Sequence, residues 1–287
     1  MNNSNDLISI IEEKYDKFSK GQKMIADFII KHYDKAAFMT ASKIGETVDI
    51  SESTVVRFAS ALGFSGFPEL QEALQVLIKN KLTTVQRIGL DEDINKDLEK
   101  FNKRILRNEI NGIKNLSENL DSESLDNGAE IIASAKKVFI LGLRTSNTLA
   151  NYLGFYLDVM LDSVVIVNDS GVSSLFEQVF RITENDVLIA IGFPRYSSKT
   201  IEAVKMAKKR GAKIVAITDT SESPLCPYSN VSLFAKNNIV SFVDSLVIPM
   251  ALINNLILNI SSKVQNDIVE YFNELEELWE KHSTYQL

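Results

Sequence analysis

The sequence contains few of the side chains that disulfides and metal sites require. Cys226 is the one cysteine among 287 residues, which excludes a disulfide within the chain. The two histidines, His32 and His282, lie near opposite ends of the sequence, so no cluster has the spacing of a transition-metal site. We therefore expect no metal and no other cofactor.

Long apolar runs and targeting signals are missing as well. No segment is long and apolar enough to span a bilayer, and the opening MNNSNDLISIIEEKYDK lacks the basic start and apolar run of a signal peptide. These absences predict a cytoplasmic protein with no membrane partner. The net charge of −7 argues against nonspecific coating of nucleic acid, which depends on bulk positive charge. Any DNA-binding surface must therefore be local.

The first 80 residues contain apolar stripes at helical spacing, separated by capping and turn residues. The stripes predict four helices, over 18–33, about 40–48, 52–62, and from about 68. Helix starts are marked by Ser19, by Thr40 or Ser42, and by Ser51. In a helix-turn-helix, two helices meet at a small residue and a tight turn, followed by an apolar anchor. Gly45, Asp49 and Ile50 occupy those three places.

The third predicted helix would then be the recognition helix, because it follows this turn. Its first residues can offer N–H groups to a phosphate or side chains to base edges. The alternative is a helical hairpin that packs on the rest of the protein behind an ordinary serine cap. Residues 1–80 contain nine Lys and Arg against eleven Asp and Glu, so a few well-placed cations must bind the DNA. The candidate DNA-binding residues are Lys43, Ser51, Glu52, Ser53, Thr54 and Arg57.

Beyond residue 80 the pattern changes twice. Residues 81–124 are polar and predict a linker near 82–92 and a long connecting helix. A further helix is predicted to start at Asp121 or Ser122 and to end near Lys136. Short apolar runs then alternate with amphipathic segments, which is typical of a doubly wound parallel sheet. The expected fold class is α + α/β: an all-helical helix-turn-helix domain over 1–80, a connecting helix within 81–124, and a five-stranded domain over 125–287. Strands are predicted at 138–142, 163–167, 187–191, 213–217 and 230–234, and helices near 146–161, 172–182 and 198–210.

Polar loops follow two of these strands. Ligands of such sheets bind beyond the carboxyl ends of the strands, and a helix N-terminus there can hold an anion. GLRTSNT and GFPRYSSKT each combine an arginine with hydroxyl side chains, and the loop over 218–230 could form a third wall. Either loop alone reads equally well as a capped helix with a solvated arginine, but the pair favours one shared anion site. The candidate ligand-binding residues are Arg144, Thr145, Ser146, Arg195, Tyr196, Ser197 and Ser198.

The closing segment SSKVQNDIVEYFNELEELWEKH predicts an amphipathic helix, which needs a surface to cover. It could pack on its own sheet domain. We expect it to contribute to a dimer contact instead. The apolar residues at helical spacing are Val264, Ile268, Phe272, Leu275 and Leu278, with Trp279 beside them.

Two parts of the sequence resemble one known family. Residues 18–74, with KMIADFIIKHYDKAAFMTASKIGE and SESTVVRFASALGFSGFPEL, resemble the helix-turn-helix of RpiR (MurR/RpiR) transcription regulators. Residues of about 125–260, with AKKRGAKIVAITDTSESPL, are similar to the sugar isomerase (SIS) domain of these regulators. The resemblance implies a regulator that binds double-stranded operator DNA, and whose SIS domain binds a small anionic effector. It also implies a homodimer or homotetramer.

The SIS loops depart from the family pattern. Phosphosugar-binding members usually have Gly-x-Gly-x-Ser in the first loop and Ser-x-Ser-Gly-x-Thr in the second. Here Arg144 replaces the second glycine, and Gly192, Pro194 and Arg195 stand at the Ser, Ser and Gly positions. Arginine forks bind phosphate and carboxylate equally well. A phosphosugar and a carboxylated metabolite therefore remain alternatives.

An enzyme is the alternative function: a SIS sugar-phosphate isomerase or deaminase with a helical extension. SIS isomerases need a general base, commonly His or Glu, and neither histidine lies in this domain. Glu177 and Glu202 remain, but a lone Glu on a predicted helix is usually solvated. We therefore expect a regulator and not an enzyme, with a non-catalytic protein-interaction module as a third, weaker reading.

Overall fold

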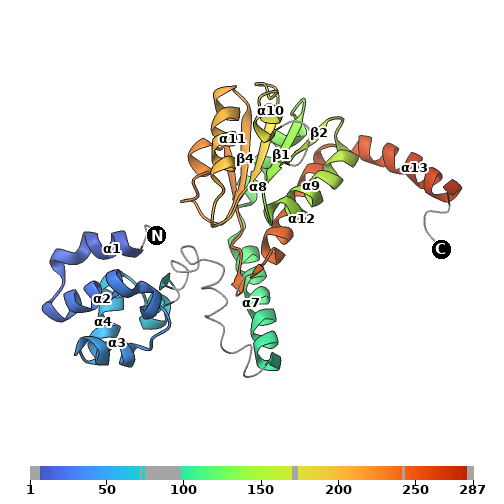
Figure 1. The fold of residues 1–287 in the computed structure, drawn as a ribbon. Helices are drawn as coiled ribbons and strands as arrows, with labels where there is room; N and C mark the ends of the chain where they lie inside the picture. The colour runs from blue at the N-terminus through green and yellow to red at the C-terminus, as the bar shows by residue number, and fades with distance from the viewer. Residues whose placement is uncertain (1–6, 72, 75–97, 170–173, 241–242, 283–287) are drawn as a thin grey trace. The chain divides into compact units, whose positions relative to one another are not determined.

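The computed structural model describes residues 7–71, 73–74, 98–169, 174–240 and 243–282. The chain divides into two compact units, Met1–Glu92 and Asp93–Leu287 (Figure 1). No helix in these described segments is long and apolar enough to cross a bilayer. The linker expected near 82–92 lies outside the described residues.

The first unit is helical, as the apolar stripes predict. Residues 67–71 and 73–74 are helical as well. Buried apolar side chains from every helical segment of this unit form one core. In this core the rings of Phe18 and Phe58 pack edge to face, with their centroids 5.2 Å apart. Thr40, and not Ser42, caps the second predicted helix. The elements are α1 (Leu7–Lys14), a 3-10 turn (Tyr15–Lys17), α2 (Lys20–Ala36), α3 (Ala41–Val48) and α4 (Glu52–Leu62).

The second unit contains a parallel sheet of five strands in the order β2-β1-β3-β4-β5. The alternation of apolar runs predicted all five strands within one residue of their observed ends. The three central strands are buried along almost their whole length, as expected where helices cover both faces of a sheet, and the two edge strands are mostly half-buried. The strands are β1 (Val138–Gly142), β2 (Val164–Val167), β3 (Val187–Ile191), β4 (Lys213–Thr218) and β5 (Val231–Phe234).

Helices cover both faces of this sheet (Figure 1). One core lies between the sheet and α8, α9 and α12, and a second core lies between the opposite face and α10 and α11. Asp121 caps α8 by accepting hydrogen bonds from the N–H groups of Glu123 and Ser124. The helices are α7 (Leu98–Asn119), α8 (Ser122–Ala133), α9 (Ser146–Met160), α10 (Leu175–Val179), α11 (Ser198–Lys209), α12 (Val247–Lys263) and α13 (Gln265–His282).

Several local features differ from the expectations or were not among them. The helix predicted over 172–182 is the short α10, and the helix predicted to end near Lys136 stops at Ala133. A two-stranded antiparallel ribbon, β6 (Ile239–Val240) with β7 (Val243–Asp244), was not predicted. The closing helix is separate from α12, and Val264 is the residue between them instead of part of the apolar stripe. Of Phe272, Leu275, Leu278 and Trp279, Phe272 and Leu278 are exposed and the other two are half-buried.

Candidate DNA interface and effector site

The turn between α3 and α4 has the geometry of a helix-turn-helix. Asp49 ends α3 in the left-handed conformation, with φ of 57°. A Cβ on Gly45 would lie 2.5 Å from the carbonyl oxygen of Ile50, so only glycine permits this approach of the two helices. Gly45 therefore allows the close contact and Asp49 forms the turn, as predicted. Ile50 packs against the core of the unit, as expected of the apolar anchor.

The predicted DNA-binding hydroxyls at the start of α4 bind one another. Ser51 occupies the N-cap position without capping the helix through its side chain. Its Oγ lies 3.0 Å from Oγ of Ser53 and 2.9 Å from Oγ1 of Thr54. The methyl group of Thr54 lies beside Gly21 of α2, which leaves Thr54 half-buried. Hydrogen bonds among its own side chains thus stabilise the first turn of α4.

The two predicted cations of this unit are both exposed, and both have partners. Nε of Arg57 donates to the Ser53 carbonyl oxygen at 3.2 Å, and a terminal nitrogen donates to Thr54 Oγ1 at 3.3 Å. Lys43 pairs with Glu46 at 3.0 Å. Both Lys43 and Glu46 are solvent-exposed, so this ion pair is weak and the lysine can exchange it for a phosphate.

One contact of α4 was not predicted. Nζ of Lys14, at the end of α1, lies 3.2 Å from the carbonyl oxygen of Ala61 and 2.9 Å from that of Leu62. These are carbonyls of the last turn of α4, which have no partner within the helix. Lys14 therefore connects the end of α1 to the end of α4 by hydrogen bonds. Nothing in the sequence around Lys14 distinguishes it from other surface lysines.

The two predicted anion-binding loops leave neighbouring strands at the same edge of the sheet. β1 and β3 pair in parallel up to Gly142 and Ile191. The helices that follow them, α9 and α11, pack on opposite faces of the sheet. The winding therefore reverses between β1 and β3, and in sheets of this type ligands bind at that point.

The first loop holds Arg144 in a conformation that suits glycine. Its φ is 57°, in the left-handed region that costs an L-residue free energy. Its side chain is exposed and has no ion pair with any described residue. Ser146 follows at the start of α9 and is 6% exposed. The Ser146 hydroxyl lacks a hydrogen-bond partner within the described ranges, and Thr145 beside it is exposed without capping the helix.

The second loop is fastened to the loop after β4. The Tyr196 hydroxyl donates to Oδ1 of Asp219 at 2.5 Å. Oγ1 of Thr218 donates to the Gly192 carbonyl oxygen at 2.7 Å and lies 2.8 Å from Oγ of Ser223. Burial, with help from the neighbouring Asp219 carboxylate, raises the pKa of Tyr196 well above its ordinary value. Tyr196 therefore stays protonated at physiological pH and remains a donor to Asp219.

The other members of the second loop stand at its exposed rim or at the start of α11. Arg195 and Ser198 are exposed, and Ser197 is half-buried at the N-cap position without a side-chain cap. Lys199 forms an ion pair with Asp169, which follows β2. Asp169 and Asp219 were not among the predicted site residues, although Asp219 lies in the loop over 218–230 that was expected to form a third wall.

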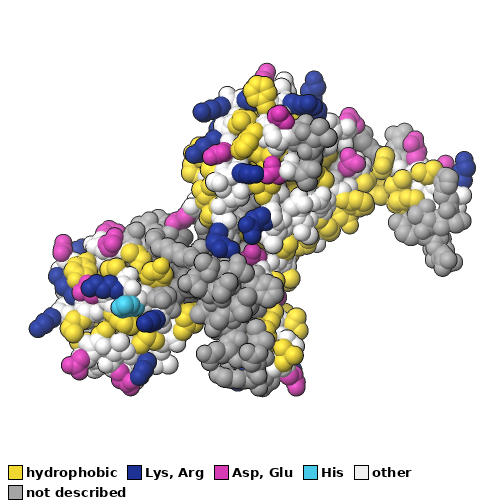
Figure 2. All heavy atoms as spheres, in the orientation of Figure 1, with side chains coloured by type: hydrophobic (Ala, Val, Ile, Leu, Met, Phe, Trp, Pro, Cys, Tyr) yellow, Lys and Arg dark blue, Asp and Glu magenta, His cyan; other side chains and the backbone are white. Residues whose placement is uncertain are grey.

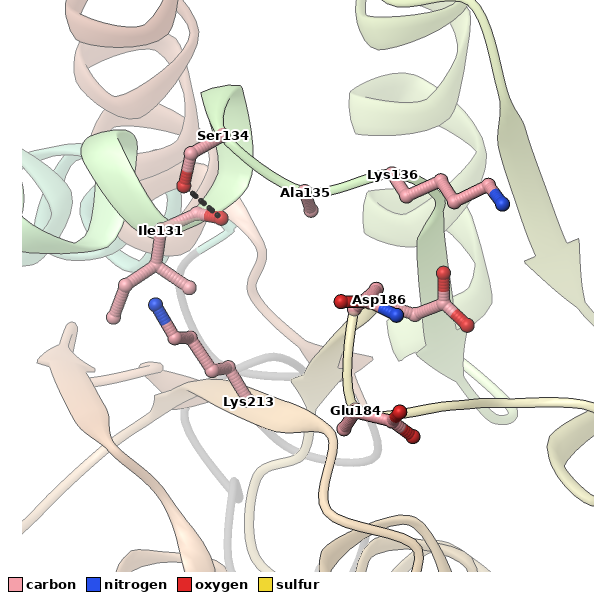
Figure 3. Close-up of a pocket in the computed structure, with 8 residues that line it drawn as sticks. Ile131, Ser134, Ala135, Lys136, Glu184, Asp186 and Lys213 are labelled. Carbon is pink, nitrogen blue, oxygen red and sulfur yellow. Dashed lines mark hydrogen bonds between the residues drawn. The ribbon is translucent and has the colours of Figure 1, made fainter.

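A separate pocket of about 370 Å³ lies at the amino ends of β1, β3 and β4, the edge opposite these loops. Figure 3 shows that Lys136 and Lys213 in this pocket extend in different directions. Asp186 accepts two hydrogen bonds of 2.8 Å from Thr183. The charged groups of this pocket do not converge on a common point, so the two loops at the carboxyl edge remain the candidate anion site.

Comparisons with known proteins identify both parts of the chain. Residues 5–81 match the model of the helix-turn-helix domain of the rpiR family, and residues 131–259 match the SIS domain. The chain belongs to the RpiR family. This chain is a helix-turn-helix transcriptional regulator that also carries a SIS domain.

Relatives and solved structures agree with this family. An uncharacterized HTH-type transcriptional regulator of Caldanaerobacter subterraneus is 23% identical over 285 residues, covering 95% of this chain and 96% of the relative. One from Clostridium perfringens is 25% identical over 227 residues, covering 79% and 80%. The sugar isomerase domain of an RpiR transcription factor from Sphaerobacter thermophilus superimposes with a TM-score of 0.59 at 23% identity, covering 62% of this chain and 99% of that one.

A longer structural match covers both domains. The Vibrio vulnificus NanR protein, solved in complex with ManNAc-6P, superimposes with a TM-score of 0.57 at 20% identity, covering 96% of this RpiR-family chain and 98% of that one. At this identity the match shows a shared fold. It confirms the predicted arrangement of a helical N-terminal region followed by a five-stranded SIS domain.

Proposed function

We propose that a small anion, bound between the loops after β1 and β3, changes the affinity of this regulator for operator DNA. The observation that carries the proposal is Arg144. It keeps a backbone conformation that glycine would adopt without strain, and its guanidinium has no ion pair with any residue the structure describes. Strain of this kind is retained at functional sites. An anion at the start of α9 would supply the missing partner.

The anion we propose first is the phosphate of a phosphosugar. The N-terminus of a helix favours an anion through its free N–H groups and its dipole. α9 offers such an end beside Arg144 and the buried hydroxyl of Ser146. NanR, which shares the fold, was solved with a phosphosugar, and this supports the assignment.

A carboxylated metabolite is the second candidate, because of one specific feature of the second loop. Gly192 and Pro194 stand where phosphosugar-binding SIS domains usually have serines, so two phosphate ligands are lost. Arg195 stands nearby on the exposed rim. Two guanidinium forks without those hydroxyls suit the planar carboxylate as well as phosphate.

We further propose that the SIS domain has no catalytic activity. Glu177 accepts a hydrogen bond from the N–H group of Ser174 at 2.6 Å and serves as the capping box of α10. Glu202 lies exposed on α11. Neither carboxylate is buried, as a general base enclosed in an active site would be. Turnover of a sugar phosphate by the purified protein would contradict this proposal.

A thermal-shift screen of phosphosugars against carboxylated metabolites tests the effector proposal. A ligand that binds only the native state, present at a hundred times its Kd, stabilises it by about 2.7 kcal/mol, or about 5 to 10 °C for a domain of this size. The ligand found should then change the Kd for operator DNA in a gel-shift titration at fixed salt. Stabilisation by neither class, or stabilisation without any change in DNA affinity, would contradict an anion sensor.

Arg57→Ala tests the DNA interface. We expect operator affinity to fall about tenfold, because a cation on the outward face of α4 is lost while the buried face stays intact. The measurement is a gel-shift titration at fixed salt, with a circular dichroism spectrum to show that the helices persist. Lys103→Ala, which removes one positive charge from α7, is the control. Equal affinities of the wild type and Arg57→Ala would remove Arg57 from the interface.

We propose that α13 forms part of a dimer contact. Val269, Phe272 and Leu278 of this helix are exposed, as is Phe155 on α9. Figure 2 shows hydrophobic side chains at the surface where α9 and α12 lead to α13. A contiguous exposed patch of this kind is typical of an interface.

Truncation after Val264 tests this contact. It keeps Lys263, which pairs with Asp126 of α8 at 2.7 Å and helps to hold the end of α12. We expect the truncated chain to be monomeric by light scattering at concentrations where the full chain is a dimer or a tetramer. A truncated protein of unchanged mass would contradict a role of α13 in assembly.

A further inference from the structure

The outward face of α4 carries one apolar side chain among polar ones. Glu52, Ser53, Val56 and Arg57 line a shallow hollow on this face. Val56 is 40% exposed, whereas its neighbour Val55 is fully buried in the core. The helix thus presents two adjacent valines in opposite directions, and only Val55 is explained by the packing of the unit.

Polar groups close to Val56 in the sequence form hydrogen bonds with one another. The guanidinium of Arg57 is held by the Ser53 carbonyl oxygen and the Thr54 hydroxyl. The Ser53 hydroxyl lies 3.0 Å from that of Ser51. These hydrogen bonds fix the positions of the side chains that surround the two methyl groups of Val56. An incoming surface would therefore meet a preformed apolar spot and not a mobile set of chains.

We propose that Val56 contacts the 5-methyl group of a thymine in the operator. The inference rests on the function above, in which α4 enters the major groove. The edges of the bases in that groove carry hydrogen-bond donors and acceptors, and the thymine methyl is the apolar group among them in unmodified DNA. Residues of the first turns of a recognition helix reach these edges. Val56 lies in the second turn, on the same face as Glu52 and Ser53.

The chemistry sets the size of the effect. Removing one methyl group from a buried apolar contact weakens binding by about threefold to tenfold. The contact also determines specificity, because cytosine at the same position has only a hydrogen at C5 and would leave Val56 without an apolar partner. Val56 is then a residue that selects thymine, while Lys43 and Arg57 supply affinity.

The experiment uses the full-length protein and a duplex that it selects from a random pool. Each thymine is replaced in turn by 2′-deoxyuridine, which removes the 5-methyl group and leaves the hydrogen bonds of the base pair unchanged. We expect at least one position where the replacement weakens wild-type binding threefold to tenfold. The same replacement should have no effect on Val56→Ala, because the methyl has lost its partner. Val56→Thr, which keeps one methyl group, should retain part of the sensitivity.

Matched controls separate this contact from others. Phe38→Ala removes an apolar side chain that is 44% exposed but lies outside α4, and it should keep every deoxyuridine sensitivity of the wild type. If Val56→Ala also keeps every sensitivity, or if no position is sensitive in the wild type, the Val56 inference is wrong while DNA binding stands. If the wild type selects no duplex at all, DNA binding by this unit fails and the inference fails with it.

Discussion

Gly45→Ala is expected to abolish operator binding while leaving effector binding intact. The new Cβ would lie 2.5 Å from the carbonyl oxygen of Ile50 and 3.3 Å from the nitrogen of Glu52. Both are backbone atoms, so the clash can be relieved only by moving α3 and α4 apart. We expect a loss of stability of about 2 kcal/mol or more, because overpacking is not relieved by a side-chain rotation.

The sign of this effect is informative. Alanine in place of a helical glycine usually stabilises a helix by up to about 1 kcal/mol, so a large loss can come only from the contact with the turn. Thermal unfolding of the first unit should shift down by at least about 8 °C, and calorimetric titration of the SIS domain ligand should not change. An unaltered unfolding temperature would mean that the turn is looser than the structure shows.

Gly21→Ala is the matched control. It too replaces a helical glycine next to Ile50, but its Cβ would lie 3.1 Å from the Cδ1 of that side chain. A flexible methyl group can turn away where a carbonyl oxygen cannot. We therefore expect Gly21→Ala to bind DNA within about twofold of the wild type, since no backbone has to move. If both variants lost DNA affinity equally, any carbon added to α2 or α3 near Ile50 would be disruptive. The effect of Gly45→Ala would then not be specific to the turn.

Much of the fold could be predicted because its signals are local. The period of the apolar residues changes near residue 137, from helical stripes to short runs, and each run forms a strand of the sheet. Gly45 and Asp49 identified the turn because few other residues allow the close approach and the left-handed conformation, and Ile50 did so as the apolar residue that follows. The break at Val264 had no such signal, since a helix-forming sequence continues on both sides of it. The ribbon of β6 and β7 is too short to produce a readable pattern.

The candidate effector site was predicted in composition but not in detail. Its hydroxyl and guanidinium side chains follow strands, and the parallel pairing of β1 and β3 brings their loops to one edge. The hydrogen bond from Tyr196 to Asp219 joins residues 23 apart in the sequence, and such a partner cannot be read from a single chain without its fold. Nor could the sequence show that Arg144 has a positive φ, because arginine rarely adopts one.

That conformation makes Arg144 the site of the sharpest prediction. Arg144→Ala and Arg144→Gly both remove the guanidinium, and each should weaken effector binding about tenfold to a hundredfold, since a charge-assisted hydrogen bond is lost. The two variants should differ in stability. Glycine adopts the left-handed conformation without strain. Arg144→Gly should therefore have a free energy of unfolding about 1 kcal/mol higher than that of Arg144→Ala, and should unfold at a higher temperature.

Calorimetric titration and thermal unfolding of both variants, with Arg144→Lys as a third, measure these effects. Arg144→Lys keeps the charge but not the fork, so it should bind a phosphate or a carboxylate more tightly than Arg144→Ala does and less tightly than the wild type does. If the strain at Arg144 is kept for the ligand, Arg144→Gly gains stability as it loses affinity, and the DNA affinity of the ligand-free protein stays the same in all three. Should Arg144→Gly bind the ligand as tightly as the wild type, the guanidinium is solvated surface, and the anion must be held by Ser146, Ser197 and the N–H groups of α9. In that case the gain in stability would remain, because it depends on the backbone alone.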